Sequence, residues 1–442
     1  MTTFAPFQHY PNLFMLTSEE RTAIWKLMQQ EIVPAIGCTE PISVALCTAG
    51  ACGVLQHKAE RIDAYLSANI IKNAMGVGIP GTGMTGLPIA IALGALKGKK
   101  EDGLELLKGI TAEDVEQAKQ FIREQRIAIH LYQETEEKLY IEVRCTSGNH
   151  TSRAIISGAH TRFIYIGLDD RTLLERPEEA PLKNAIEIAP PLTFRTIYEF
   201  AKDSPLEELY FILEGARMNM VVAEEALTRQ YGHNVAGTLM QRKGRKVFGD
   251  NLNSRMVIAT AGACDVRMDG AMVPVMSNSG SGNQGIAATV PVMTFAEEEG
   301  CSEESLIRAL TLSSLLIIYI KQHLGKLSAL CGCVVASTGS ACGITWLMGG
   351  SYSQIIFAAK NMIANITGMI CDGAKPSCAL KIASGVSTAT LSAVMAMEDE
   401  GVTAQEGIID EDIDQTIRNL ALIGNKGMKE TDRLVLNIMT TK

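Results

Sequence analysis

The chain has 442 residues, enough for a large core and for two or three domain-sized units. Hydrophobic residues make up 47% and charged residues 20%, so the chain can bury enough apolar surface to fold and is not a disordered protein. The net charge is −9 and basic residues form no block, which excludes the electrostatic pattern of proteins that bind nucleic acid or anionic lipid.

Three long uncharged stretches are each interrupted by Gly, Ser, Thr, Asn or Pro. We therefore expect them to pack inside a helical core and not to span a membrane. They cover residues 73–96, 270–296 and 327–359. The N-terminal segment lacks a basic region followed by an apolar run, so we expect no signal peptide. Eleven cysteines without a secretion signal indicate reduced thiols, metal ligands or catalytic groups in a cytoplasmic protein.

Two helices are predicted before residue 56. Thr17-Ser18-Glu19-Glu20 is a capping box that begins the first, which ends at Pro34. Pro41 suits the first position of the second, which is apolar on all sides to Leu55. Cys38 directly precedes this helix start. A thiol at a helix N-terminus is expected to have a lowered pKa, which favours the thiolate.

Residues 57–185 follow a different pattern. A strand is predicted at 61–67 and an amphipathic helix at 111–125. Short alternating runs separated by polar turns then predict an antiparallel strand meander. Its strands are expected at 127–133, 138–145, 152–157 and 162–168. We therefore expect an α+β lobe at 57–185, inserted into a body formed by residues 1–56 and 186–442.

From Leu192 onward the sequence is typical of helices. Ser204-Pro205-Leu206-Glu207 predicts a helix start, with Ser204 as the cap, and that helix is expected to reach residue 232. Further helices are predicted at 302–323, 352–370, 377–398 and 403–422. The predicted fold class is α+β: a mostly helical body with glycine- and alanine-rich buried helices, and the inserted lobe with its meander.

Two glycine-rich segments deserve comparison with known binding loops. Three matches to G-x-G-x-x-G occur, at 76–81, 81–86 and 280–285, but none lies between a strand and a helix of a βαβ unit, so we expect no NAD site. The segment 277–285 combines hydroxyls, amides and open backbone N–H groups, which can hold a small carboxylate. Asn73 and the segment 81–83 would form a second wall. A pair of tight interhelical turns explains the same composition equally well.

Three cysteines are placed where turns and helix starts can bring their thiols together. Cys371 is expected to close one helix, Asp372-Gly373 to turn the chain, and Cys378 to lie in the first turn of the next helix. Cys331 begins another uncharged helix. Because no C-x₂-C pair occurs, zinc ribbons and ferredoxin-type sites have no support, and spacing alone leaves metal binding open. The other cysteines apart from Cys38 are expected to be core or turn residues: Cys47, Cys52, Cys145, Cys264, Cys301, Cys333 and Cys342.

Five motifs, in order along nearly the whole chain, together resemble one family. They are GCTEP (37–41), PGTGMTGLP (80–88), MSNSGSGNQG (276–285), LSALCGC (327–333) and GMICDGAKPSCALK (368–381). They resemble the L-cysteine desulfidases, including the UPF0597 proteins, which are related to the α part of iron–sulfur L-serine dehydratases.

The resemblance implies a [4Fe–4S] cluster with one iron open to substrate, and no NAD or pyridoxal phosphate. It implies elimination of L-cysteine to pyruvate, ammonia and hydrogen sulfide, with L-serine or another β-substituted amino acid as the alternative substrate. The three cluster ligands of the relatives correspond best to Cys331, Cys371 and Cys378. The last two are closer in sequence here than in the dehydratases, so Cys38 is the alternative third ligand.

The remaining roles follow from residue chemistry. Cys38 is our candidate for the base that removes the Cα proton. Glu40 or Asp372 would lie near the substrate ammonium. The other expected substrate-binding residues are Thr39, Asn73, Thr82, Asn278, Ser279, Gly280, Ser281 and Gly282. The expected partner is a small amino acid, with a homodimer as the usual oligomer. A non-catalytic protein that binds cysteine or sulfide is the alternative from another class.

Overall fold

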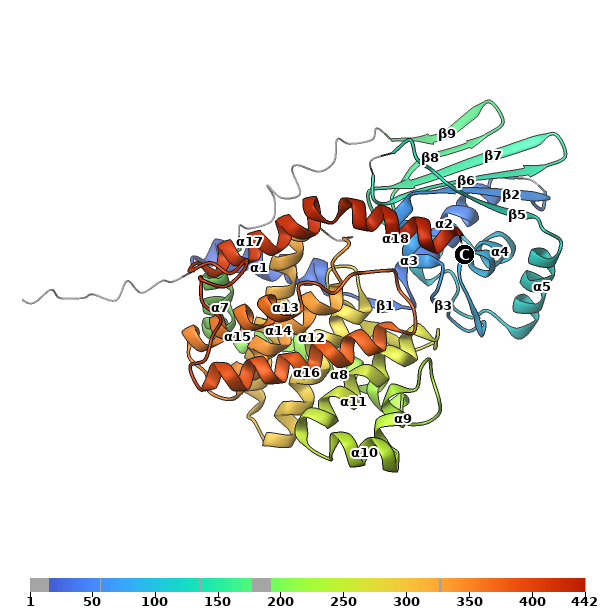
Figure 1. Ribbon diagram of the computed structural model, residues 1–442. Coiled ribbons are helices and arrows are strands. Elements are labelled where there is room, and N and C mark those ends of the chain that lie inside the picture. The colour runs from blue at the N-terminus through green and yellow to red at the C-terminus, as the bar shows by residue number, and fades with distance from the viewer. Residues whose placement is uncertain (1–15, 56, 136, 177–191, 326–327, 442) are drawn as a thin grey trace, which may run out of the picture.

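The computed structural model describes residues 16–55, 57–135, 137–176, 192–325 and 328–441. The predicted absence of a signal segment before residue 16 and the predicted domain boundaries at residues 56 and 186 fall outside the described residues. The predicted fold class is confirmed, because a large helical body carries a lobe that contains a six-stranded sheet (Figure 1).

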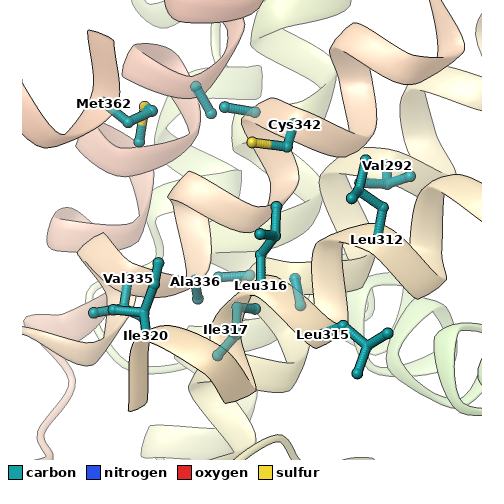
Figure 2. Packing of buried hydrophobic residues seen from close by; sticks show 14 of the residues in the cluster. Val292, Leu312, Leu315, Leu316, Ile317, Ile320, Val335, Ala336, Cys342 and Met362 are labelled. Atoms are coloured by element: carbon teal, nitrogen blue, oxygen red, sulfur yellow. The ribbon is translucent and has the colours of Figure 1, made fainter. Parts of the chain in front are cut away.

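The helical body is built around one large hydrophobic cluster. Its central helices are α12, α13, α14 and α15, whose apolar side chains interdigitate at Val292, Leu316, Val335 and Met362 (Figure 2). The helices of the body are α1 (Ser18–Glu31), α7 (Phe194–Asp203), α8 (Leu206–Glu225), α9 (Val235–Met240), α10 (Arg242–Phe248), α11 (Leu252–Met268), α12 (Gly282–Glu299), α13 (Glu303–Leu324), α14 (Gly332–Leu347), α15 (Tyr352–Ile366), α16 (Cys378–Met397) and α17 (Ile413–Leu422). A short strand pair, β1 (Pro34–Ile36) and β10 (Pro274–Met276), joins the chain before α2 to the chain before α12.

The lobe contains a six-stranded sheet in the order β5-β2-β6-β7-β8-β9. Three strands of the predicted meander are confirmed as β6, β7 and β8, and β9 extends it by one strand that the sequence analysis did not predict. The strand predicted at 127–133 forms as β5, but its place in an antiparallel meander is wrong. β5 pairs with β2 in parallel because the chain returns to the sheet through helical segments. The strands are β2 (Arg61–Leu66), β5 (Ile127–Leu131), β6 (Tyr140–Ser147), β7 (His150–Ser157), β8 (Phe163–Leu168) and β9 (Arg171–Glu175).

Helices of the lobe pack on one another and on this sheet (Figure 1). They are α2 (Thr39–Cys52), α3 (Ala68–Ala74), α4 (Leu87–Leu96) and α5 (Ala112–Arg123), with a 3₁₀ turn at Lys100–Glu105 and a small hairpin of β3 (Gly78–Ile79) and β4 (Met84–Thr85). We predicted that α2 belongs to the body, because residues 1–56 were assigned to it. The apolar side chains of α2 instead belong to the hydrophobic cluster of the lobe. The reason is that α2 packs against α4 and strands β6 and β7.

Three predicted helix limits are wrong. The helix predicted at 403–422 begins only at Ile413: the Thr403 amide and hydroxyl donate to Glu406 Oε1, but Gly407 then has a φ of +59° and the chain turns. The helix predicted to reach residue 370 ends at Ile366. The helix predicted at 204–232 is capped by Pro205 and ends at Glu225, while Ser204 terminates α7.

One described helix, α16, is long and apolar enough by length and composition to cross a bilayer, and 44% of its apolar window is buried inside the structure. Its inner face, with Ala379, Ile382 and Val386, belongs to the main hydrophobic cluster. A core helix of a globular protein passes the same test of length and composition. α16 lies outside the three uncharged stretches for which the sequence analysis predicted packing in a helical core.

Candidate functional site

A cavity of about 110 Å³ lies where the lobe meets the helical body. Its walls come from the start of α2, the end of α3, the loop after β7, and the body helices α11 to α14 and α16. Its volume is comparable to the engineered cavity of about 150 Å³ that holds benzene, so it suits a small molecule. The residues that line it include five cysteines: Cys38, Cys331, Cys333, Cys371 and Cys378.

Cys331, Cys371 and Cys378 reach this cavity from three different segments. Cys331 is the N-cap of α14, as predicted. Cys371 does not close a helix, because α15 ends earlier; it lies in an extended segment whose backbone pairs with the chain before α14. The Cys331 amide donates to Met369 O at 3.0 Å, and the Cys371 amide donates to Ala329 O at 2.7 Å. This pairing holds the two thiols beside each other.

Cys378 is the first residue of α16, as the sequence predicted, and its thiol lies 3.7 Å from the carbonyl oxygen of Gly373. Burial raises its pKa to about 11. Burial also raises the pKa of Cys371, although the Lys72 ammonium opposes that shift. These thiols are therefore protonated without a metal, and metal binding at this site would release protons.

Cys333 was predicted to be a core or turn residue, but it lines the cavity two residues after Cys331. A hydrogen bond between its thiol and that of Cys331, together with burial, raises the pKa of Cys333 well above its usual value. Cys264, on α11, is fully buried and close enough to Cys331 and Cys378 for their charges to affect its pKa. The site therefore has more sulfur donors than the three that sequence reasoning selected.

The donor set suits an iron–sulfur cluster better than a single ion. Within the described ranges, no three His, Cys, Asp or Glu side chains form a group that could hold one metal ion. In a four-iron cluster each thiolate binds a different iron, so its ligands stand apart. Buried thiols from separate segments, facing one cavity, match that requirement, and soft thiolate ligands favour iron–sulfur chemistry.

Gly373 joins the cysteine segment to the lobe. Its φ is +91°, and a Cβ at this position would lie 1.9 Å from the carbonyl oxygen of Lys72 on α3. Lys72 is itself buried, and its ammonium forms an ion pair with Asp432 on α18 (Lys429–Thr441). Only glycine allows the turn after Cys371 to approach α3 this closely.

Cys38 is the N-cap of α2 but makes no capping hydrogen bond through its side chain. Its thiol instead donates to Glu40 Oε2 at 3.0 Å. Burial, followed by the Glu40 charge, raises the pKa of Cys38, although Arg267 opposes the shift. The expected lowering of this pKa is therefore wrong: desolvation and a neighbouring carboxylate outweigh the helix N-terminus.

Glu40 is the one carboxylate among the described residues that line the cavity. Its Oε1 accepts from Asn73 Nδ2 at 3.3 Å, and its Oε2 accepts from Thr39 Oγ1 at 3.2 Å as well as from Cys38. Glu40 and Asn73 both reach the cavity wall, whereas Thr39 supports Glu40 from the side. Asp372 is bound instead by Lys375 and Lys381.

Part of the glycine-rich segment 277–285 lines the cysteine cavity. Ser279, Gly280 and Ser281 line the cavity, and the first two have positive φ values of +50° and +80°. Asn278 holds the loop from behind, because its Nδ2 donates to Ser314 O at 3.1 Å and its Oδ1 accepts from Ser279. Gly282 begins α12 behind this wall.

Thr82 does not reach the cavity wall. Its hydroxyl donates to Ile79 O at 2.7 Å and accepts from the Met84 amide at 3.0 Å, so it stabilises the β3–β4 hairpin. The second wall that we predicted from residues 81–83 is therefore formed by Asn73 without Thr82.

Several lining residues were missed by sequence reasoning. Arg267 and Lys321 are cations on α11 and α13, and both are buried against the cavity. Arg267 lies between Asp265 and Asp269 in the sequence, which is typical of a surface segment. Lys321 follows the uncharged run 315–320, and because a charge in a buried helix is costly, its position was a usable signal. His160 enters from the loop after β7, where the sequence gives no such signal. Asn283 and Gln284 enter from the first turn of α12; they belong to the glycine-rich segment 277–285 but were not among the residues selected from it.

A larger groove of about 600 Å³ lies between α11, α12, α14 and α16. Its lining is mainly apolar, with Phe295, Ile344 and Leu347 among its residues, and Glu299 is its charged group. It lacks the converging polar groups that orient a substrate, so the cavity at the cysteines is the candidate site.

Comparison with known proteins relates most of this chain to the serine dehydratase alpha chain family and to the UPF0597 proteins. Residues 101–437 match the family described as the serine dehydratase alpha chain. A UPF0597 protein of Bacteroides thetaiotaomicron is 59% identical over 427 residues, which cover 97% of this chain and 99% of the relative. A UPF0597 protein of Porphyromonas gingivalis is 50% identical over 435 residues, covering 97% and 100%. A third, from Yersinia enterocolitica, is 42% identical over 425 residues, covering 95% and 97%.

Proposed function

The chain belongs to the serine dehydratase alpha chain family and, within it, to the UPF0597 proteins, and on that premise we propose that it is an iron–sulfur-dependent lyase that acts on L-cysteine. The reaction is L-cysteine plus water to pyruvate, ammonia and hydrogen sulfide. The observation that carries the proposal is that three cysteine-bearing segments and the Cys38–Glu40 pair face one small cavity.

Cys331, Cys371 and Cys378 would hold a [4Fe–4S] cluster, with Cys38 as the alternative third ligand and Cys333 as a further thiol in the wall. When bound, the cluster would supply a Lewis acid for the leaving sulfur of the substrate. Lys72 would stabilise the ligand thiolates, because its ammonium opposes the rise in the pKa of Cys371 that burial causes.

Glu40 would bind the substrate ammonium, since it is the carboxylate available in the described wall. Cys38 remains our candidate for the base, although its thiol is not activated by the helix terminus. The Cys38 thiol donates to Glu40 at 3.0 Å; when the substrate ammonium takes its place on that carboxylate, the thiol would lose its proton to solvent, and the thiolate could then accept the Cα proton. Loss of sulfide then leaves an aminoacrylate, which rearranges and hydrolyses to pyruvate and ammonia.

L-Serine is the second candidate substrate, because the matched family is described by serine dehydratase. Both substrates share the amino-acid portion and differ in the leaving atom. A thiolate leaves more readily and binds soft metal ions better than a hydroxide does, which favours L-cysteine. An oxygen-sensitive cluster also favours the reducing cytoplasm as the compartment.

The test is to purify the protein without oxygen, record its visible spectrum, and measure sulfide and pyruvate release from L-cysteine beside L-serine. A brown protein that forms sulfide and pyruvate in equal amounts from L-cysteine supports the proposal. Faster turnover of L-serine would transfer the proposal to a dehydratase. A protein that remains inactive after cluster reconstitution, yet is stabilised by cysteine or sulfide, would instead be a binding protein.

A further inference from the structure

Arg267 is a buried cation that forms no ion pair with any of the described carboxylates. Its side chain is 5% exposed, and its Nη1 and Nη2 donate to two neutral acceptors, Asn283 Oδ1 and Gly37 O, each at 3.0 Å. Its Nε has no hydrogen-bond partner, and none of the described carboxylates forms an ion pair with it. Because a buried charge is costly unless it is paired, an anionic ligand beside this guanidinium would be stabilising.

The first turn of α12 lies against the Arg267 guanidinium. A Cβ on Gly282 would lie 2.3 Å from Arg267 Nε, so the guanidinium rests directly against the first residue of this 18-residue helix. The N-cap, Ser281, makes no side-chain capping bond, and the N–H groups of a first helical turn have no acceptor within the helix. The helix N-terminus and the arginine therefore provide positive potential at one wall of the cavity.

A second unpartnered group lies beside them. Gln284 Oε1 is buried without a hydrogen-bond partner, and this side chain packs against Gly332, between the cavity cysteines Cys331 and Cys333. Gln284 is 3% exposed and lines the same cavity. The wall therefore combines a buried arginine donor, Arg267 Nε, and a buried amide acceptor, Gln284 Oε1, and neither has a hydrogen-bond partner.

The charges of the cavity indicate which anion fits. Arg267 and Lys321 are its cations, and Glu40 is the carboxylate of its described wall. A multivalent anion such as phosphate would be repelled by Glu40. A zwitterion, in contrast, can place its carboxylate at Arg267 and its ammonium at Glu40, and in a cavity of about 110 Å³ it must be small.

We propose that Arg267, with the first turn of α12, binds the α-carboxylate of the substrate and restricts the site to amino acids with a free carboxylate. This rests on the proposed function only in taking an amino acid as the ligand; it requires neither elimination nor a cluster. Gly282 is then a specificity residue as well, because it leaves the space in which the guanidinium lies.

The experiment compares L-alanine with L-alaninamide, which share the side chain and the ammonium and cannot lose a β-substituent. Binding to the full-length protein is measured by calorimetry and by thermal stabilisation, for the wild type and for Arg267→Met, Arg267→Lys and Gly282→Ala. A charge-assisted hydrogen bond predicts that the wild type prefers the acid by about 10- to 100-fold in Kd. In Arg267→Met this ratio should fall close to one, and Arg267→Lys should restore part of it.

The ratio of the two Kd values distinguishes a lost contact to the carboxylate from damage to the fold. Damage to the fold weakens the binding of L-alanine and L-alaninamide alike, whereas loss of the contact weakens only the binding of L-alanine. Equal binding of the two ligands by the wild type, no binding of either, or an unchanged ratio in Arg267→Met would overturn the proposal. Gly282→Ala should lower the ratio even if Arg267→Met fails to fold. A protein that shows this dependence but releases no sulfide from L-cysteine would refute the proposed function and leave this inference in place.

Discussion

The thiol of Cys38 donates a hydrogen bond of 3.0 Å to the carboxylate of Glu40, two residues further along the chain. The same carboxylate accepts from Asn73 of the lobe at 3.3 Å. One buried acid therefore links the start of α2 to α3 at the wall of the cysteine cavity. The first prediction concerns this pair.

Replacing Cys38 by Ser should reduce turnover of L-cysteine by about 100-fold or more while the cluster spectrum persists, because general-base groups contribute about 10²- to 10⁴-fold. Serine keeps a donor to Glu40 but is a much weaker acid. The measurement is kcat with the visible spectrum of the same sample. Loss of the spectrum together with activity would show that Cys38 is a ligand and not the base.

Replacing Cys331 or Cys371 by Ala should abolish the iron–sulfur absorbance and the activity together. Cys333 offers the matched control, since it lines the same cavity and lies two residues from Cys331. Cys333→Ala should keep the absorbance and bind the same amount of iron per chain. If the absorbance survives in both Cys331→Ala and Cys371→Ala, the assigned ligand set is wrong.

Replacing Gly373 by Ala should destabilise the protein by at least about 2 kcal/mol, because the residue has a left-handed φ and its Cβ would overlap the Lys72 carbonyl. Urea unfolding of the metal-free protein measures the effect. Gly368, five residues earlier, has open space around its Cβ position. Gly368→Ala should therefore change stability by less than about 0.5 kcal/mol. Equal effects of the two substitutions would contradict the predicted clash.

Asp63 of β2 should support stability above pH 4 and lose that contribution as the pH falls. Hydrogen bonds from Arg61 and His130 lower its pKa to about 2, whereas an unfolded aspartate titrates near 3.9. The folded pKa is the lower one, so the contribution is present above the unfolded pKa and disappears as the pH drops towards about 2. Its size is at most about 2.6 kcal/mol, and solvent and salt reduce it because Arg61 is exposed.

Asp63→Asn should therefore destabilise the protein at pH 7 more than at pH 2.5. Urea unfolding at both pH values, at low and high salt, measures the difference. Asp170 is an exposed carboxylate of the same lobe, and Asp170→Asn is the control, expected within about 0.5 kcal/mol of the wild type at either pH. A pH-independent effect of Asp63→Asn would mean that packing and not charge is responsible.

Local sequence signals predicted several helix starts and three strands of the meander. Thr17, Ser302 and Ser377 precede helices as expected, and the alternation of residues in the lobe gave β6 to β8. The helix start predicted at Thr403 is wrong for a local reason. The Thr403 amide and hydroxyl donate to Glu406, but Gly407, with a φ of +59°, turns the chain before a helix can propagate.

The site was less predictable because contacts between residues far apart in the sequence bring its parts together. Cys371 faces Cys331 through backbone pairing with Ala329, some forty residues away, and nothing near Cys371 in sequence indicates that partner. The raised pKa of Cys38 depends on burial beneath the lobe, which a helix-start motif does not reveal. Arg267 approaches Gly37 across 230 positions, so its role emerges only from the fold.

The ion pair between Lys72 and Asp432 makes the stability of the lobe depend on a helix that is far away in the sequence. Lys72 is buried in the lobe, whereas Asp432 lies 360 positions further along, on α18, which crosses to α3 (Figure 1). A buried ammonium without its carboxylate is unfavourable, so a substitution that detaches α18 would also weaken the lobe.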